Sequence, residues 1–265
     1  MLLQSVLIVL VGLVRVGSAG GNEIMEFPTA STTSYISYRP GMPTLTAYTV
    51  CAWLMDTTPE GDNNGGVLRY WFSYNVKAND NSILLGNGVT KSLVRKNEWY
   101  HYCTSWDSVS PEITHSINGE LVKKTNNHMK GKTVPAGGIL VIGQDQDTLG
   151  GGFDARQSFV GKLYDVNLWD YVLTQDEVAS LYEQKPGDCG LGTTKNEPII
   201  SYTDLLAQTL HGAASVIDES CSGGSGEDVK CYDSNGKEFS GGESFTAVRE
   251  AKPTNILYTL ERADY

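Results

Sequence analysis

Between residues 23 and 217 the chain is a series of short segments rich in tyrosine, valine, isoleucine, threonine and tryptophan, separated by turn-forming residues. Such residues favour extended backbone, and several segments alternate apolar and polar positions as half-buried strands do. Asn118-Gly119 adds a hairpin signal. The pattern predicts an all-β sandwich of two antiparallel sheets, and about 190 residues can bury one large core. The predicted strands cover residues 35–38, 46–55, 67–74, 82–85, 99–106, 113–117, 139–142 and 159–169.

One segment breaks this β pattern and predicts a helix. Thr174 and Glu177 have the spacing of a capping box. An apolar stripe follows, and Lys185-Pro186-Gly187 ends the segment. We expect a single α-helix that packs on one face of the sandwich through Val178, Leu181 and Tyr182.

The segment between residues 142 and 159 is crowded with oxygen donors around three consecutive glycines. Its carboxylates would repel one another unless a cation or solvent separates them, and calcium takes six to eight hard oxygen ligands. The segment is not an EF-hand, because Leu149 stands at the fifth position counted from Asp145. Spacing alone leaves a solvated acidic hairpin loop as the alternative. The donors are Asp145, Gln146, Asp147, Asp154 and Gln157.

The first residues form an uncharged apolar run that ends at Arg15 and is followed by Gly17-Ser18-Ala19. This order predicts a secretory signal peptide over residues 1–19 and an extracellular protein. A membrane anchor is the alternative, but the run is short for a span.

The composition changes again beyond residue 220, where glycine and serine dominate. We therefore expect one folded domain over residues 20–220 and a weakly ordered C-terminal extension over residues 221–265. Within the extension, residues 254–260 could form a terminal strand.

The chain is acidic, with 31 Asp and Glu against 20 Lys and Arg and a net charge of −11. An acidic protein without a basic cluster is a poor partner for nucleic acid or for an anionic membrane surface. The same acidity is typical of proteins that collect divalent cations.

Five cysteines in a secreted chain imply disulfides and one remaining thiol. Cys51 and Cys103 lie in strand-like segments, whereas Cys189, Cys221 and Cys231 lie toward the C-terminus. We expect Cys221 to pair with Cys231, because the GGSG between them permits a tight loop. The third cysteine would then be free or join subunits. The chain has no CxxC pair, which argues against a structural zinc site.

No catalytic motif stands out, and we expect a binding protein rather than an enzyme. The chain has four histidines but no GxSxG elbow or HExxH pair. His101 lies two positions before Cys103, so a Cys–His nucleophilic pair is one interpretation. We favour a structural histidine beside a disulfide. Asp145 and Asp147 are the two carboxylates that come closest to the catalytic pair of a glycanase. Their glutamine neighbours suit metal binding better than acid–base catalysis.

Residues 101–108, HYCTSWDS, match the pentraxin signature of His-x-Cys-x-(Ser/Thr)-Trp-x-(Ser/Thr) at every fixed position. Residues 143–169 resemble the calcium loop and following strand of that family. Residues 72–74, followed by Asp80-Asn81, resemble the other half of its calcium site. The chain therefore resembles the pentraxin family over about residues 23–216.

The resemblance implies a lectin-like jelly roll with one helix, assembled into a cyclic homo-oligomer. It implies two adjacent calcium ions per subunit that bind phosphate- or carbohydrate-bearing ligands on cell or microbial surfaces, as in innate immunity. It also implies a disulfide between Cys51 and Cys103. The implied metal ligands are Asp80, Asn81, Asp145, the Gln146 carbonyl, Asp147, Asp154 and Gln157.

Three positions depart from the family pattern. Most members have glutamate at the position of Asp145, and Gly86 replaces an aromatic residue that flanks the methyl groups of phosphocholine. The acidic partner of choline has no match between residues 86 and 98. We therefore expect a phosphomonoester, phosphoethanolamine or an acidic sugar rather than phosphocholine. The alternatives are an extracellular adhesion or scaffold module and, less favoured, a carbohydrate-cleaving enzyme.

Overall fold

The computed structural model describes residues 22–78, 81–126, 128–186 and 197–219, and the short strands 231–232, 238–239, 245–249 and 258–262. The chain divides into two compact units, residues 22–222 and a second unit of residues 1–21 with 223–265. Among the described residues, the first unit holds both large sheets and both α-helices.

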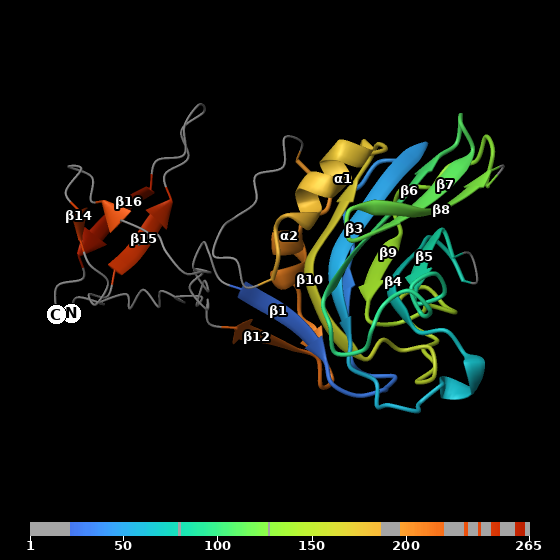
Figure 1. The fold of residues 1–265 in the computed structure, drawn as a ribbon, viewed down its shortest axis with the longest axis horizontal. Coiled ribbons are helices and arrows are strands. Elements are labelled where there is room, and N and C mark those ends of the chain that lie inside the picture. Colours follow the sequence, from blue (N-terminus) through green and yellow to red (C-terminus); the bar gives the residue numbers. More distant parts are fainter. Residues whose placement is uncertain are drawn as a thin grey trace, which may run out of the picture. The chain divides into compact units, whose positions relative to one another are not determined.

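Two antiparallel sheets form the first unit (Figure 1). The seven-stranded sheet has the order β12-β1-β10-β3-β6-β7-β8, and the five-stranded sheet has the order β11-β2-β9-β4-β5. The larger sheet consists of β1 (Asn22–Phe27), β3 (Ala47–Asp56), β6 (Tyr100–Asp107), β7 (Glu112–Ile117), β8 (Glu120–Asn126), β10 (Gly161–Trp169) and β12 (Ser215–Glu219). The smaller consists of β2 (Tyr35–Tyr38), β4 (Tyr70–Asn75), β5 (Ile83–Gly86), β9 (Ile139–Ile142) and β11 (Leu210–His211).

The predicted antiparallel sandwich is confirmed, and the strand predictions agree with it closely. Two predicted strands coincide with β2 and β9, and most others are displaced by one residue. Among the predicted strands the largest difference is at β4, which begins at Tyr70 rather than residue 67. The residues before it belong to a loop that contains the 3-10 helix η1 (Asn64–Gly66), and η1 ends where strand pairing was expected to start. The predicted ranges contain none of β1, β8, β11 and β12.

Alternation along the strands separates the core from the outer face of the larger sheet. In β3, Val50 and Leu54 point into the cluster between the sheets, whereas Cys51 belongs to a second cluster. That second cluster lies under α1 (Gln175–Tyr182), which buries Val178 and Leu181. Figure 1 shows α1 beside β3 and β10. The helix therefore covers the outer face of the seven-stranded sheet.

The predicted helix begins at its predicted cap. Thr174 and Glu177 make both hydrogen bonds of the capping box. The structure adds α2 (Tyr202–Leu206), capped in the same way by Ser201 and Asp204. Five residues make little more than one turn, too short for an apolar stripe to show in the sequence.

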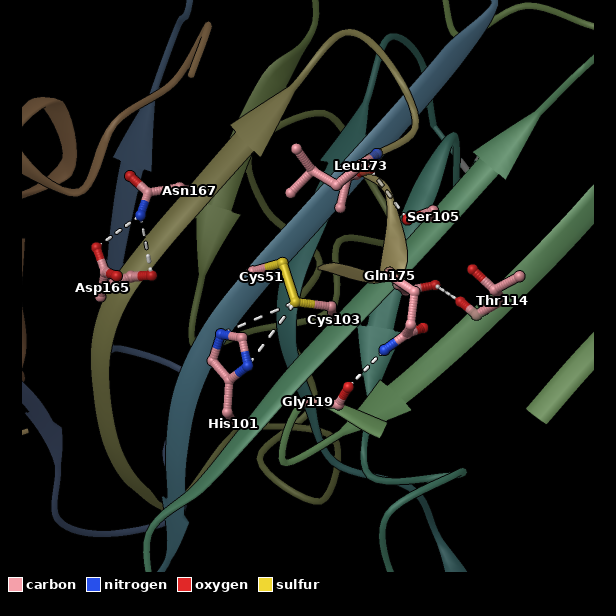
Figure 2. The surroundings of a disulfide bond; sticks show 12 residues. Cys51, His101, Cys103, Ser105, Thr114, Gly119, Asp165, Asn167, Leu173 and Gln175 are labelled. Carbon is pink, nitrogen blue, oxygen red and sulfur yellow. Dashed lines mark hydrogen bonds between the residues drawn. A yellow bond between two sulfur atoms is a disulfide. The ribbon is translucent and has the colours of Figure 1, made fainter. Parts of the chain in front are cut away.

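A disulfide joins Cys51 to Cys103, which face each other across β3 and β6 (Figure 2). His101 lies on the same face of β6, with its Nε2 3.8 Å from the Cys103 sulfur. The sulfur is already bonded to Cys51, so it offers no thiolate for a Cys–His pair. His101 is 2% exposed, and its burial lowers its pKa to about 3. The prediction of a structural histidine beside a disulfide is confirmed.

The buried His101 should make the fold sensitive to acid. Its pKa is about 3 in the folded chain and near 6.5 when exposed, so below pH 6.5 the unfolded chain binds the extra proton. Between pH 7 and pH 4 this should lower the free energy of unfolding by about 3 kcal/mol. Urea unfolding at several pH values measures the slope, which should be shallower for His101→Gln. The exposed His128→Gln control should keep the wild-type slope, and equal slopes in all three proteins would contradict the assignment.

The second unit contributes four short strands to the described residues. β13 (Cys231–Tyr232) pairs with β14 (Glu238–Phe239), and β15 (Phe245–Arg249) pairs with β16 (Tyr258–Arg262). The strand expected over residues 254–260 overlaps β16. Residues 1–19, Cys189 and Cys221 lie outside the described residues, so the predicted signal peptide and Cys221–Cys231 bond remain predictions. No described helix is long and apolar enough to cross a membrane.

Candidate metal centre

The donor-rich loop connects β9 to β10 and folds back over the outer face of the five-stranded sheet. Gly143 begins it with a φ of +92°, and a Cβ there would come within 2.4 Å of the Phe27 ring. Only glycine therefore fits this turn. The Gly143 N–H donates to the Trp71 carbonyl at 3.0 Å, and the Tyr70 N–H donates to the Gln157 carbonyl at 2.8 Å. These bonds tie both ends of the loop to the start of β4.

The side chain of Gln146 anchors the loop to the sheet. It is fully buried, and its Nε2 donates to the carbonyls of Ser73 at 2.7 Å and Ile139 at 3.1 Å. Its Oε1 accepts the Gly150 N–H at 2.8 Å, which fixes the glycine turn. The Gln146 carbonyl accepts from the Asn75 amide at 2.7 Å and retains a second lone pair. The predicted donor of this residue is that carbonyl, and its side chain has a structural role.

Asp145 is a buried carboxylate with one oxygen unsatisfied. It is 4% exposed, and its Oδ2 accepts from Gln157 Nε2 at 2.9 Å. Its Oδ1 has no hydrogen-bond partner among the described residues, and neither has Asn75 Oδ1. Burial, and then the charge of Asp147, raise the pKa of Asp145. A buried carboxylate oxygen without a donor is costly, and a cation would remove that cost. The donor set therefore fits a hard divalent metal ion.

The other two carboxylates of the loop are more open. Asp147 is exposed. Asp154 accepts hydrogen bonds from Arg156, whose Nη2 lies 2.6 Å from Asp154 Oδ2 and whose Nε lies 3.1 Å from the same oxygen. These side-chain bonds, followed by the bond from the Arg156 backbone N–H, lower the pKa of Asp154. Arg156 is thus a residue of the site that sequence reasoning missed.

The second predicted segment is only partly described. Asn81 is exposed and has a φ of +43° in the turn before β5. Asp80 lies outside the described residues. Five predicted donors thus lie on one loop, and Asn81 lies in the turn between β4 and β5. Among the described residues, the carboxylate oxygens of Asp145, Asp147 and Asp154 do not all lie within 4.8 Å of one another.

Tyr70 occupies the space beside Gly86. A Cβ built on Gly86 would lie 2.6 Å from the Tyr70 ring and 2.5 Å from the Arg69 carbonyl oxygen, so no side chain fits there. The pKa of Tyr70 is raised by burial and then by the charge of Asp145. The Tyr70 ring therefore lies beside Gly86, where the family has an aromatic side chain, and close enough to the donor loop for the charge of Asp145 to act on it.

Ser73 and Asn75 are further residues that the sequence analysis did not assign to the site. They alternate with Phe72 and Tyr74 in β4, a pattern that would predict solvent exposure. Both are fully buried, because the donor loop covers them. The alternation of polar and aromatic residues in this strand was the only sequence signal for their role. It could not reveal burial, because their hydrogen-bond partner Gln146 is more than 70 positions away.

Comparison with known proteins agrees with this architecture. Residues 23–200 match the model of the Pentaxin family, which is most of the chain. The chain belongs to the pentaxin family. It is 34% identical to mouse mucosal pentraxin over 196 residues, covering 67% of this chain and 81% of that protein. It is 30% identical to the human neuronal pentraxin receptor over 213 residues, covering 75% of this chain and 40% of that protein.

The solved structures include a heptameric SAP-like pentraxin from Limulus polyphemus. It aligns with a TM-score of 0.60 at 22% identity, over 76% of this chain and 97% of that one. At this identity the likeness establishes the fold, which is the pentraxin jelly roll. The chain spans about two-fifths of the length of the neuronal relatives that it matches.

Proposed function

We propose that this pentaxin-family chain is a secreted, calcium-dependent lectin that binds phosphate- or carbohydrate-bearing ligands on cell or microbial surfaces, in innate immune recognition. The observation that carries the proposal is Asp145, a buried carboxylate with an unsatisfied oxygen on a loop with two more carboxylates. Family membership supports calcium as the metal. A binding role also agrees with the disulfide at Cys103, which leaves His101 no thiol to activate.

Two adjacent calcium ions per subunit would be held by the predicted donors on the loop and on the turn between β4 and β5. When bound, calcium supplies positive charge and open coordination positions for phosphate or sugar oxygens. The chain's own contribution is to hold the carboxylates in place, through Gln146 below the loop and Gln157 beside Asp145. The proposed ligands are Asp80, Asn81, Asp145, the Gln146 carbonyl, Asp147, Asp154 and Gln157.

Gly86 and Tyr70 bear on which ligand fits. Position 86 has no side chain to flank a choline group, and the Tyr70 ring with its hydroxyl lies beside it. A ring with a polar tip suits a sugar or a phosphomonoester better than three methyl groups. We therefore propose phosphomonoesters, phosphoethanolamine or acidic sugars as ligands.

Assembly into a ring is part of the proposal. The structurally similar Limulus pentraxin is heptameric. Head-to-tail interfaces that close produce cyclic symmetry, and a ring with its sites on one face gains avidity on a repetitive surface. In this proposal residues 20–220 form the ring-building domain and residues 221–265 form an extension.

A second candidate function is an extracellular scaffold that clusters other proteins. It is favoured by the similarity to neuronal pentraxins and to the neuronal pentraxin receptor. A scaffold would bind a protein partner regardless of chelator, whereas a lectin would release its ligand when calcium is removed.

The test is an array of immobilised glycans, phosphomonoesters and phospholipid headgroups, probed with the full chain in calcium and in EDTA. Binding to one of the anionic classes should disappear in EDTA and return when calcium is added back. Binding that is unchanged by EDTA on every spot would refute the calcium-lectin proposal. Calcium titration by calorimetry, read beside the array, gives the number of ions bound.

Removing Arg156 should strengthen calcium binding. Its guanidinium occupies the Asp154 carboxylate, and its positive charge would repel a neighbouring calcium ion. The pair is exposed and screened by solvent, so Arg156→Gln should raise calcium affinity only about two- to fivefold. Calorimetric titration of wild type, Arg156→Gln and Arg156→Lys separates the two effects, since lysine keeps the charge but lacks the planar fork. Weaker calcium binding by Arg156→Gln would show that the guanidinium supports the site instead.

A further inference from the structure

A cleft of about 260 Å³ lies beside the donor loop and belongs to a different part of the chain. One wall is the segment that follows β3 and contains η1, and the other is the segment between β5 and β6. Two hydrogen bonds link the first wall to the C-terminal end of the donor loop. Asn64 Nδ2 donates to the Arg156 carbonyl, and Arg69 Nη1 donates to the Ser158 carbonyl. None of the loop's proposed calcium ligands lines the cleft.

Arg69 places a buried cation in this cleft. It is 7% exposed, with Nη1 donating to the Ser158 carbonyl at 3.1 Å and Nη2 donating to Asp62 at 3.2 Å. A guanidinium carries five N–H donors, and within the described residues its side chain makes these two hydrogen bonds. Its remaining N–H donors are the ones that acceptors on a ligand would use.

The amide side chains of the lining also present donors. Asn63 Oδ1 accepts the Gly65 N–H at 2.9 Å, and Asn87 Oδ1 accepts the Arg69 N–H at 3.1 Å. With each carbonyl oxygen engaged, each NH₂ group has no acceptor among the described residues.

Two of the three carboxylates of the lining, Asp56 and Asp62, are engaged within the protein. Asp56 Oδ1 accepts from the N–H and the hydroxyl of Thr58 at 2.8 and 2.7 Å. Asp62 accepts from the Asn64 N–H and from Arg69, and these interactions lower its pKa. Glu60, the third carboxylate of the lining, is exposed and makes no side-chain hydrogen bond or ion pair among the described residues, so it is the one free acidic group at the rim of the cleft.

Basic residues line the opposite wall. Lys91 has no side-chain partner among the described residues, and Arg95 pairs only loosely with Glu98 at 3.6 Å. Lys96 Nζ donates to the Pro59 carbonyl at 2.7 Å, which bridges the two walls. The lining thus holds four cations against three carboxylates, a small positive excess on a chain of net charge −11. A general attraction for polyanions cannot arise from such a net charge, so anion binding here would be local.

We propose that this cleft binds a sulfated or phosphorylated sugar without calcium. The shared chemistry is a tetrahedral oxyanion, which Arg69 and Lys91 bind through charge-assisted hydrogen bonds. The amide groups of Asn63 and Asn87 donate to hydroxyl oxygens of the ring. The site is separate from the proposed calcium centre and does not depend on it.

The test is calorimetric titration of the full chain in EDTA with N-acetylglucosamine 6-sulfate, N-acetylglucosamine 6-phosphate, unmodified N-acetylglucosamine and inorganic sulfate. One or both anionic sugars should bind at least about tenfold more tightly than the unmodified sugar and than inorganic sulfate. The stronger of the two anionic sugars identifies the oxyanion. Lys91→Ala/Arg95→Ala should weaken that binding about tenfold, since each exposed charge contributes modestly.

The matched control is Lys130→Ala/Lys132→Ala, which removes the same charge from exposed positions near the opposite end of β6. It should bind as wild type does.

Absence of binding by both anionic sugars in EDTA would overturn the proposal, as would equal binding of the unmodified sugar. Inorganic sulfate binding as tightly as the sulfated sugar would overturn the sugar component. Equal losses in the two double variants would overturn the location. Because calcium is absent throughout, failure here leaves the calcium-lectin proposal standing, and failure of that proposal leaves this result standing.

Discussion

Replacing Asp147 with asparagine is expected to weaken calcium binding by about tenfold or more and to abolish ligand retention at limiting calcium. The substitution keeps the shape of the side chain and removes one of three carboxylates on the loop. Asparagine retains a neutral oxygen, so the loss reflects charge rather than the number of donors. Asp147 is exposed and contributes nothing to the core, so the free energy of unfolding without calcium should change by less than about 0.5 kcal/mol.

The measurements are calorimetric calcium titration and retention on a ligand resin in calcium and in EDTA, with urea unfolding as the check on the fold. Asp170→Asn is the matched control, because Asp170 is also exposed but lies after β10, outside the donor loop. The control should bind calcium as wild type does. Asp147→Asn with wild-type affinity, or wild type that stays on the resin in EDTA, would exclude the proposed metal bridge.

Removing the disulfide between Cys51 and Cys103 is expected to cost about 4 kcal/mol of stability. The bond closes a loop of 52 positions, so its loss returns considerable freedom to the unfolded chain. Most single domains have a total stability of about 5–15 kcal/mol, so this loss would bring the fold close to unfolding. Both cysteines are also buried beneath Val178 and Leu181, so α1 should become less tightly docked.

Urea unfolding of wild type, of wild type under reducing conditions and of Cys51→Ala/Cys103→Ala measures this effect. The reduced wild type keeps both sulfur atoms but loses the predicted Cys221–Cys231 bond as well, whereas the double variant removes only the Cys51–Cys103 bond and adds the loss of packing. Hydrogen exchange in α1 reports on its docking. An unchanged midpoint after verified reduction would show that packing of the second cluster, rather than the covalent link, holds the two strands together.

The main elements of the fold could be predicted because their signals are local. The residue types of β2 and β9, the capping box at Thr174 and the apolar positions of α1 lie within single stretches of sequence. The donor loop was visible for the same reason, since five oxygen donors and three glycines lie within thirteen positions. The short helix α2 was missed because one turn leaves no periodic pattern.

The environment of the donors could not be predicted in this way. From the sequence, Asp145 would be expected to lie exposed in an acidic loop, yet it is only 4% exposed. Its burial depends on the loop folding back onto β4, where Gln146 bonds to a carbonyl 73 positions away. The same long-range contact makes Ser73 and Asn75 part of the site. Contacts between distant segments leave no spacing for sequence analysis to detect.

The sequence by itself determined the β-sandwich, the helix on its outer face, the family resemblance and the identities of the candidate ligands. Only the tertiary structure decided which of those ligands is buried, that the Tyr70 ring fills the space beside Gly86, and that Arg156 holds Asp154. It also decided that Arg69 and Asn87 share a cleft with Lys91. The physical reason is that strand and cap preferences act over a few residues. Burial, pKa and unsatisfied donors depend instead on which distant segments the folded chain brings together.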